Sequence, residues 1–341
     1  MAMAGDGVNA NCSHQRLLQS PAVLPKAQTM TLTIRPLAEA DLPEAERIIR
    51  VAFGTFLEAP DPETFWSDLD YAKGRFGAEH VAAFAAEEDG RLVGTNFATR
   101  WGSVGFFGPI TIRPDAWNGG AGQRLVQAVC NAFDAWSISH AGLFTFPQSP
   151  KHVWTYGKFG FHPRFLTAIM ALPVTEGAGQ GAVRYSELSE SQRREVERGI
   201  RGLTEQLYPG LDLGAEIRTV FARKLGDTLV LLEGDSRVDG FAVCHWGPGT
   251  EAGEGNFFVK FGAVRPGAGE RSFDALIDGC RSLAGSVGMS TLLAGVNLGR
   301  EAAYRHLQKR GFRTQFQGVT MHRPNEAGYS KPGLFVVDDW R

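Results

Sequence analysis

The stretch ITIRPDAWNGGAGQRLV, residues 110–126, contains the change of pattern on which the fold assignment depends. Its apolar start is typical of a strand that ends at Pro114, and a helical pattern begins near Gly120. Gly119, Gly120 and Gly122 lie at this turn, where the backbone can approach a ligand closely because no Cβ intervenes. The free N–H groups and the dipole at a helix start favour an anion, so a diphosphate would suit this turn.

A glycine turn can also serve packing alone, so a second motif is needed to decide. Residues 156–161 (YGKFGF) lie at the end of an expected short helix and the start of a strand. The two motifs together resemble those of the GNAT superfamily of N-acetyltransferases. In that family a Q/R-x-x-G-x-G/A loop holds the diphosphate of coenzyme A, and residues 117–122 (WNGGAG) occupy it here. The family's Y-x-x-x-G-F motif is matched by residues 156–161, and the resemblance covers the order of elements over residues 31–175.

This resemblance implies which residues bind acetyl-CoA. The end of the strand would offer free backbone groups to the pantetheine arm, and an N–H there could polarise the thioester carbonyl. The alternative is an ordinary central strand in which every backbone group is paired. The expected cofactor-binding residues are Ile110, Thr111, Ile112, Trp117, Asn118, Gly119, Gly120, Ala121, Gly122, Gln123 and Ser149.

Tyr156 is the expected general acid, which would protonate the departing thiolate. A phenol has a pKa of about 10 and so remains protonated at neutral pH. The alternative is a packing tyrosine that caps the helix. Two residues depart from the family pattern: Trp117 replaces the usual Gln or Arg, and Ser149 stands where many members carry Asn. Neither change excludes coenzyme binding, because backbone amides would do most of it.

The sequence assigns no general base and only outlines the acceptor side. Conceivable bases are Glu87, Glu88, Asp115, His152 and His162. By resemblance, the segment 54–71 would line the acceptor pocket. Its apolar walls could come from Phe56, Phe65 and Trp66, and a cation could be attracted by Glu58 and Asp61. Each of these residues taken singly also suits an aromatic core helix with exposed acids.

Hydrophobic periodicity predicts a mixed α/β (α+β) sheet with helices on both faces. The expected strands of the first half are 30–37, 81–88, 91–101, 105–114, 140–147 and 161–174, and the expected helices are 38–52, 61–76, 120–136 and 149–157. A similar order recurs after GAGQG (177–181), with strands at 228–234, 237–246, 256–266, 291–298 and 313–324, and helices at 190–207, 214–225, 270–284 and 299–309. The repeat predicts two tandem GNAT-like domains.

The expected domain limits are a disordered extension over 1–29, a catalytic domain over 30–176, a linker over 177–182 and a degenerate copy over 183–341. The first of these would be an upstream extension if Met30 is the true start. In the second copy Ser272 stands where the first has Gly120, and Leu307 occupies the position of Tyr156. That copy is therefore expected to be structural or to form a wall of the acceptor pocket. The tail LFVVDDWR (334–341) could add a strand or reach across the domain boundary.

Composition narrows the class of protein. A net charge of -2 gives no reason to expect nucleic acid or an anionic membrane as partner, and no apolar run is long enough for a spanning helix. Four scattered cysteines without a CxxC pair predict reduced thiols, a cytoplasmic location and no metal site.

The leading interpretation is an acetyl-CoA-dependent N-acetyltransferase, a monomer or homodimer, that acts on a small-molecule amine by direct transfer in a ternary complex. One alternative is a catalytically inactive protein that binds or senses acyl-CoA, which Trp117 and the missing base favour and Tyr156 opposes. Another is a protein lysine acetyltransferase, which would need an open, acidic acceptor groove.

Overall fold

The computed structural model describes residues 31–174, 182–234 and 237–341, and Leu32–Arg341 pack as one unit. The expected extension over 1–29 and the glycine-rich linker segment 177–181 lie outside the described residues. None of the helices in the described part of the chain is both long and apolar enough to cross a lipid bilayer.

The first half of the chain follows the expected order of elements. Its strands are β1 (Leu32–Pro36), β2 (Val81–Glu88), β3 (Arg91–Trp101), β4 (Val104–Phe107), β5 (Thr111–Ile112), β6 (His140–Thr145) and β7 (His162–Pro173). Its helices are α1 (Leu42–Phe56), α2 (Ala72–Arg75), α3 (Ala121–Ala135) and α4 (Pro150–Gly157), with short 3-10 turns at η1 (Glu39–Asp41) and η2 (Pro114–Ala116).

The second half repeats this order with two longer helices at its start. It contains β8 (Ala182–Arg184), η3 (Tyr185–Glu187), α5 (Glu190–Leu207), α6 (Gly214–Arg223), β9 (Gly226–Glu233), β10 (Arg237–Gly247), β11 (Gly253–Val264), α7 (Gly269–Ser286), β12 (Thr291–Asn297), α8 (Glu301–Lys309), β13 (Arg313–Arg323) and β14 (Val336–Asp338). The fold is thus a mixed α/β architecture with two similar copies, as the periodicity predicted.

The helix expected over residues 61–76 is wrong. Only its end, Ala72–Arg75, is helical, and residues 62–68 form successive turns. Asp61 accepts a hydrogen bond from the Glu63 N–H through its side chain, which favours a turn over a helix. Trp66 then adopts a positive φ of 51°, which no α-helix interior allows. The spacing of the aromatic residues suggested one face of a helix. In the structure the successive turns, and not a helix, bring the rings of Phe65 and Trp66 together.

The strand expected over residues 105–114 is broken in two. β4 ends at Phe107 and β5 covers only Thr111–Ile112. Pro109 lies at the break and has no N–H to donate to a neighbouring strand, so the ladder is interrupted there. The Gly108 N–H still bonds to the Phe97 carbonyl at 2.9 Å, which keeps the break close to β3.

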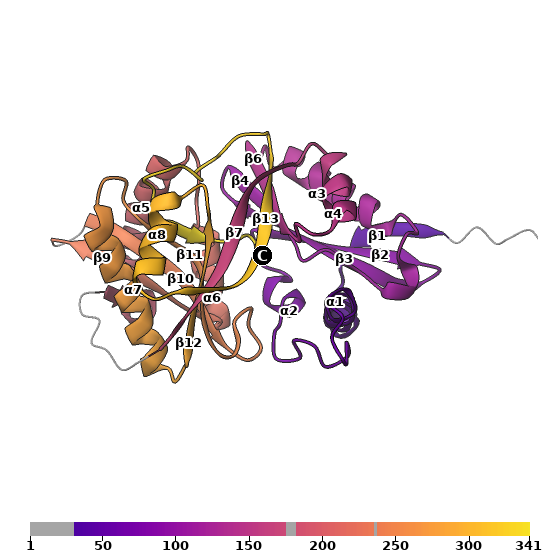
Figure 1. Ribbon diagram of the computed structural model, residues 1–341, viewed down its shortest axis with the longest axis horizontal. Helices are drawn as coiled ribbons and strands as arrows, with labels where there is room; N and C mark the ends of the chain where they lie inside the picture. Colours follow the sequence, from indigo (N-terminus) through magenta and orange to yellow (C-terminus); the bar gives the residue numbers. More distant parts are fainter. Residues whose placement is uncertain (1–30, 175–181, 235–236) are drawn as a thin grey trace, which may run out of the picture. The chain divides into compact units, whose positions relative to one another are not determined.

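The described strands form one continuous sheet in which the two halves exchange their last long strands (Figure 1). The order is β1-β2-β3-β4-β6-β13-β7-β12-β11-β10-β9-β8. β13 of the second half pairs with β6 of the first half, and β7 of the first half pairs with β12 of the second. β7 and β13 also pair with each other, so both halves share the centre of the sheet.

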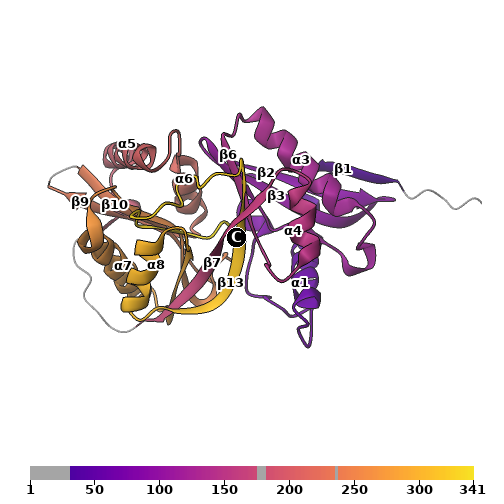
Figure 2. The ribbon, with the colours of Figure 1, turned by 45° about the horizontal axis from the view of Figure 1, so that its top comes forward.

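Helices cover both faces of each half (Figure 2). In the first half α1 packs with Phe97 on one face, while α3 and α4 pack with Ala98 on the other, as the alternation along β3 requires. In the second half α5 and α6 pack with Phe241 on one face, and α7 and α8 pack with Ala242 on the other.

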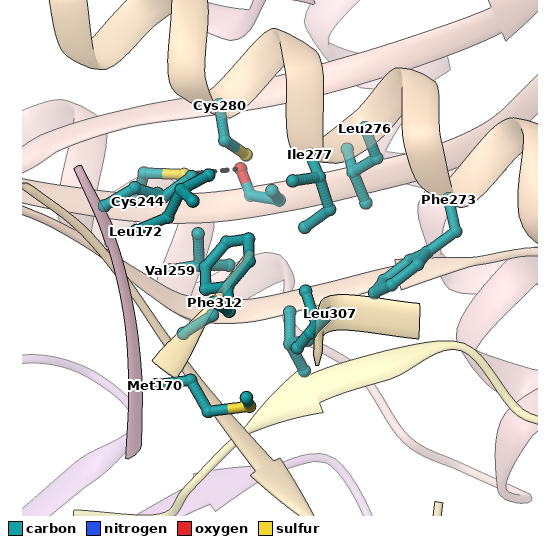
Figure 3. Packing of buried hydrophobic residues seen from close by; sticks show 14 of the residues in the cluster. Met170, Leu172, Cys244, Val259, Phe273, Leu276, Ile277, Cys280, Leu307 and Phe312 are labelled. Atoms are coloured by element: carbon teal, nitrogen blue, oxygen red, sulfur yellow. Dashed lines mark hydrogen bonds between the residues drawn. The ribbon is translucent and has the colours of Figure 1, made fainter. Parts of the chain in front are cut away.

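The apolar core between α7, α8 and the sheet contains two thiols (Figure 3). Cys244 and Cys280 are fully buried and free, and burial raises the pKa of the Cys244 thiol well above its ordinary value. Leu307, which stands at the position of Tyr156, points into the same core with Phe312. Its side chain therefore serves packing.

The tail of the chain adds a strand and also reaches the first half. β14 pairs antiparallel with the end of β11, from Phe261 to Ala263. Trp340, two residues beyond β14, packs against Gly142 of β6 and lies 5.0 Å, ring to ring, from His322 of β13. Both possibilities that the sequence left open for this segment are realised.

Candidate active site

The break in the first half leaves one strand edge without a partner. β4 pairs in parallel with β6 from Val104 to Phe107, but β5 beyond the break pairs only with β3 among the described strands. The opposite edge of β6 pairs with β13 from Ala141 to Thr145, whereas β6 pairs with β4 only as far as Leu143. We call the place beyond Phe107 and Leu143, where β4 and β6 no longer pair, the splay. This splay lies at the carboxyl ends of two parallel strands, where open α/β sheets commonly bind ligands.

Alternation along β5 decides which backbone groups face the splay. Thr111 is paired with Thr95 of β3, and its hydroxyl lies 3.1 Å from the Thr95 hydroxyl in a buried contact. Because successive residues of a strand direct their backbone groups to opposite edges, those of Ile110 and Ile112 face away from β3. The structure therefore places the backbone groups of Ile110 and Ile112 at the open edge, and those of Thr111 within the ladder.

The glycine turn presents an uncapped helix start. Gly120 is the N-cap of α3 with a φ of 87°, and no side chain bonds to the first N–H groups of the helix. A Cβ placed on Gly120 would meet nothing within 4 Å, so the outer face of the turn is open. The N–H groups of Ala121, Gly122 and Gln123 belong to the first turn of α3 and have no intrahelical acceptor. An anion would satisfy them.

Trp117 and Asn118 tie this turn to its surroundings. The indole N–H of Trp117 donates to the Ile112 carbonyl at 2.7 Å, and its ring remains 38% exposed. Asn118 has a positive φ of 70° and accepts a hydrogen bond from the Lys151 ammonium at 2.7 Å. The turn is thus joined to β5 on one side and to α4 on the other, and Lys151 brings a positive charge beside it.

Ser149 begins α4, and Tyr156 lies near its end. The Ser149 hydroxyl accepts from the His152 N–H at 3.4 Å, so this side chain caps the helix. Tyr156 is buried, and its ring packs edge-on against Phe107 with centroids 5.7 Å apart. Burial raises the pKa of Tyr156 to about 12, partly offset by a hydrogen bond with the Thr145 side chain. Tyr156 therefore lies beside the last residues of β4 and β6, at the mouth of the splay, and is protonated.

An aromatic cluster lies on the far side of Tyr156. We call Phe53, Phe56, Phe146, His152 and Phe316 the aromatic cluster; their rings come from α1, the end of β6, α4 and β13. The predicted acceptor residues Phe65 and Trp66 extend it, because Trp66 lies 5.2 Å from Phe53. Glu58 and Asp61 are exposed at its border.

The conceivable bases are spread widely. Glu87 is paired with Arg35 at 2.8 Å and Asp115 with Arg113 at 3.0 Å, both away from Tyr156. Glu88 ends β2, and His162 is exposed on β7. His152 alone of this set has a ring contact with Tyr156, at 6.4 Å between centroids; burial lowers its pKa, and its Nδ1 has no partner in the described structure.

Two residues near the site carried no signal in the sequence. Lys151 is an ordinary exposed lysine whose neighbour Asn118 lies 33 residues earlier. Arg75 donates to the Gly108 carbonyl at the strand break and is fully paired in a buried environment. Either contact could have been predicted only from a signal that links two positions far apart in the sequence. No three His, Cys, Asp or Glu side chains gather as a metal site in the part of the chain that the structure describes.

The second half has the same splay, but its own tail occupies it. β11 pairs in parallel with β12 only as far as Val259, and β14 then pairs with β11 from Phe261 onward. Ser272 lies inside the first turns of α7, and Leu307 is buried in α8. The open edge of the first half thus has a filled counterpart in the second half.

Comparison with known proteins relates part of this chain to a known family. Residues 45–161 match the sequence model of the acetyltransferase (GNAT) family. No curated protein sequence matches the chain.

Solved structures are similar over nearly the whole chain. A putative acetyltransferase from Pyrococcus horikoshii is 11% identical with a TM-score of 0.64, covering 94% of this chain and 98% of that one. A GCN5-related N-acetyltransferase from Sphaerobacter thermophilus is 17% identical with a TM-score of 0.56, covering 86% and 95%. A tandem GNAT protein from the clavulanic acid biosynthesis pathway is 12% identical with a TM-score of 0.54, covering 86% and 98%.

These structures show the fold alone, and the sequence similarity to the acetyltransferase (GNAT) family is confined to residues 45–161. The matched segment begins in α1 and ends at Phe161, so it contains the splay, the glycine turn and Tyr156. Residues 45–161 thus match a GNAT acetyltransferase domain in sequence, which supports an acyltransferase.

Proposed function

We propose that the chain transfers the acetyl group of acetyl-CoA to the amino group of a small acceptor in a ternary complex, with residues 30–176 as the catalytic copy and 183–341 as a copy without chemistry. One contrast carries this proposal. The splay of the first half has a free strand edge beside an uncapped helix start, whereas β14 fills the splay of the second half.

The residues at the splay suit the parts of the donor. Acetyl-CoA supplies an acyl group already activated as a thioester. The backbone groups of Ile110 and the N–H of Ile112 would hold the amide-rich pantetheine arm as an added strand holds to a sheet edge, because the Ile112 carbonyl already accepts from the Trp117 indole. The first N–H groups of α3 would hold the diphosphate, with Lys151 as a nearby positive charge.

Tyr156 would supply the proton that the leaving thiolate needs. As the new C–N bond forms, the C–S bond breaks, and the phenolic proton passes to sulfur. The amine releases one proton to solvent, and the tyrosinate regains one. A phenol is protonated at neutral pH, as this role requires, and burial raises the pKa of Tyr156 further. The aromatic cluster supports an acceptor that carries its amine on an apolar body.

The test is acetyl-CoA hydrolysis or transfer measured as free thiol release with a panel of amines. Tyr156→Phe should lower kcat by about 10²–10⁴-fold, because it removes proton transfer, and should leave the Kd of acetyl-CoA by calorimetry nearly unchanged. Tyr304→Phe, in the corresponding helix of the second half, is the matched control and should keep full activity. Loss of coenzyme binding in Tyr156→Phe would contradict the role as acid.

The same assay separates the alternatives. A sensor would bind acetyl-CoA without releasing thiol for any amine, and a lysine acetyltransferase would release it for a peptide but not for small amines. Acetyl-, propionyl- and succinyl-CoA in parallel would define the acyl chain. Absence of heat with every one of these thioesters would exclude the proposed donor site.

A further inference from the structure

A cluster of buried charges joins the two halves behind the strand break. We call Arg75, Glu251, Lys260, Glu216 and His80 the ion cluster; every one of these residues is at most 7% exposed. Arg75 and His80 belong to the first half, and the other three to the second. A buried charge is costly in free energy unless it is paired, so general stability alone does not explain the presence of this cluster.

The pairing within the cluster is continuous. Arg75 donates to both oxygens of Glu251, at 2.8 and 3.0 Å, in a two-pronged contact. The Lys260 ammonium lies 2.9 Å from Glu251 and 3.3 Å from Glu216. Glu216 also accepts from the Trp101 indole at 3.0 Å and contacts His80 at 3.0 Å.

The charges in the cluster hold Glu251 ionised. Burial alone would raise the pKa of Glu251, but Arg75 and Lys260 lower it below its ordinary range. Glu251 is therefore a permanent anion at neutral pH, and it fixes the plane of the Arg75 guanidinium. A planar guanidinium that is held at two nitrogens directs its remaining N–H groups along set lines.

One of those N–H groups reaches the strand break. Arg75 Nη1 donates to the carbonyl of Gly108, and the Gly108 N–H donates to Phe97. Both backbone groups of Gly108 are thus held. Because Pro109 has no N–H, Ile110 is the next residue whose backbone N–H can donate a hydrogen bond. The direction of that N–H depends on how the Gly108–Pro109 segment is fixed.

The second half anchors the cluster at its own strand irregularity. The register between β10 and β11 shifts between Val243 and Cys244, whose partners are Phe261 and Val259, so Lys260 is the extra residue of β11. This position follows the last β11–β12 pair, as Gly108 follows the last β4–β6 pair. Where the first half has its break, the second half has a buried cation.

We propose that Arg75 is a positioning residue for acyl transfer, and that Glu251 and Lys260 of the second half hold it so that the break at Gly108 keeps its geometry. This inference rests on the proposed function. The second half would then contribute to the rate without touching either substrate. Displacing a reacting group by about 1 Å can cost about 10²-fold in rate, which sets the size of the expected effect.

The test compares two isosteric changes of a buried carboxylate. Glu251→Gln weakens the grip on Arg75, whereas Asp227→Asn changes a carboxylate that is equally buried, is paired with Arg184 and contacts no residue of the ion cluster. Both variants should lose thermal stability. At a temperature where both are folded, Glu251→Gln should lower kcat at least about tenfold with an acetyl-CoA Kd within about twofold of wild type, and Asp227→Asn should keep wild-type kcat.

Arg75→Lys is the second variant, because a lysine keeps the charge but cannot bridge Glu251 and Gly108 together. It should show the same split between a lowered kcat and an unchanged Kd. Wild-type kcat in folded Glu251→Gln or Arg75→Lys, or an equal loss in Asp227→Asn, would overturn the inference and leave the proposed function intact. A wild-type protein that releases no thiol with any amine would instead refute the proposed function and this inference together.

Discussion

At the scale of single residues, a buried carboxylate holds the tail in place. Asp338 of β14 accepts hydrogen bonds from the Arg300 guanidinium and the Tyr329 hydroxyl, and all three side chains are at most 3% exposed. Asp338→Asn would leave Arg300 as an uncompensated buried charge. We expect a loss of about 3–5 kcal/mol in the free energy of unfolding, measured by urea titration.

The matched control for Asp338 is the exposed ion pair between Glu301 and Arg305 on α8. Glu301→Gln should change the free energy of unfolding by less than about 0.5 kcal/mol, because exposed pairs are weak. Similar effects of the two substitutions would show that the contact with Arg300 does not stabilise the tail.

A second pair of residues predicts acid sensitivity. His140 Nε2 lies 3.1 Å from His322 Nδ1; burial lowers the pKa of His140 to about 4, and burial together with His140 lowers that of His322 to about 3. In the unfolded chain both return to about 6.5. Below that pH the unfolded chain binds protons that the folded chain does not, so stability falls as the pH falls from 6.5 to 4. The slope should be about 1.4 kcal/mol per pH unit for each histidine.

Denaturant titrations at several pH values between 4 and 7 would measure this slope. Replacing both His140 and His322 by Asn should flatten it, although the double variant will be less stable at pH 7. His162→Asn, at an exposed position of β7, should keep the wild-type slope. An unchanged slope in the double variant would mean that other groups govern the acid response.

At the scale of elements, the exchanged strands predict that neither half folds alone. Residues 1–174 on their own would contain β7 without β12 or β13, and β6 would expose an unpaired edge. We expect fragments 1–174 and 182–341 to aggregate or melt without cooperativity when expressed separately, and to copurify in equal amounts when expressed together. Size-exclusion chromatography and thermal melts would decide. A monomeric, cooperatively melting first fragment would contradict the prediction.

Local patterns were sufficient for most elements but not for their partners. α3 was predictable because Leu125, Val126, Val129 and Phe133 form one buried face. The 61–76 helix failed because turn chemistry at Asp61 outweighed aromatic spacing. The exchange of β7 and β13 left no local trace, because the sequence of a strand does not by itself specify which strand it pairs with.

At the scale of the whole molecule, the sequence predicted the part of the site that lies within one segment of the chain. It did not predict the part that depends on contacts between residues far apart in the sequence. The strand end, the glycine turn and Tyr156 lie within 47 residues of one another, from 110 to 156, so their order alone indicated the site. The contact of Arg75 with Glu251 spans 176 residues and depends on how the two copies pack. The sequence predicted that the second copy is structural or forms a wall of the acceptor pocket. It did not indicate that Glu251 of this copy pairs with Arg75, which donates to the Gly108 carbonyl at the strand break.

The place of β13 has a consequence for how the protein is made. Translation delivers β6 early, but β13, the strand that completes its hydrogen bonding, begins only at Arg313. Until β13 has been synthesised, one edge of β6 in the nascent first half has no strand partner. We expect a chaperone that shields this edge until β13 emerges to raise the yield of active protein. The increase should be larger than for a chain whose two copies fold separately.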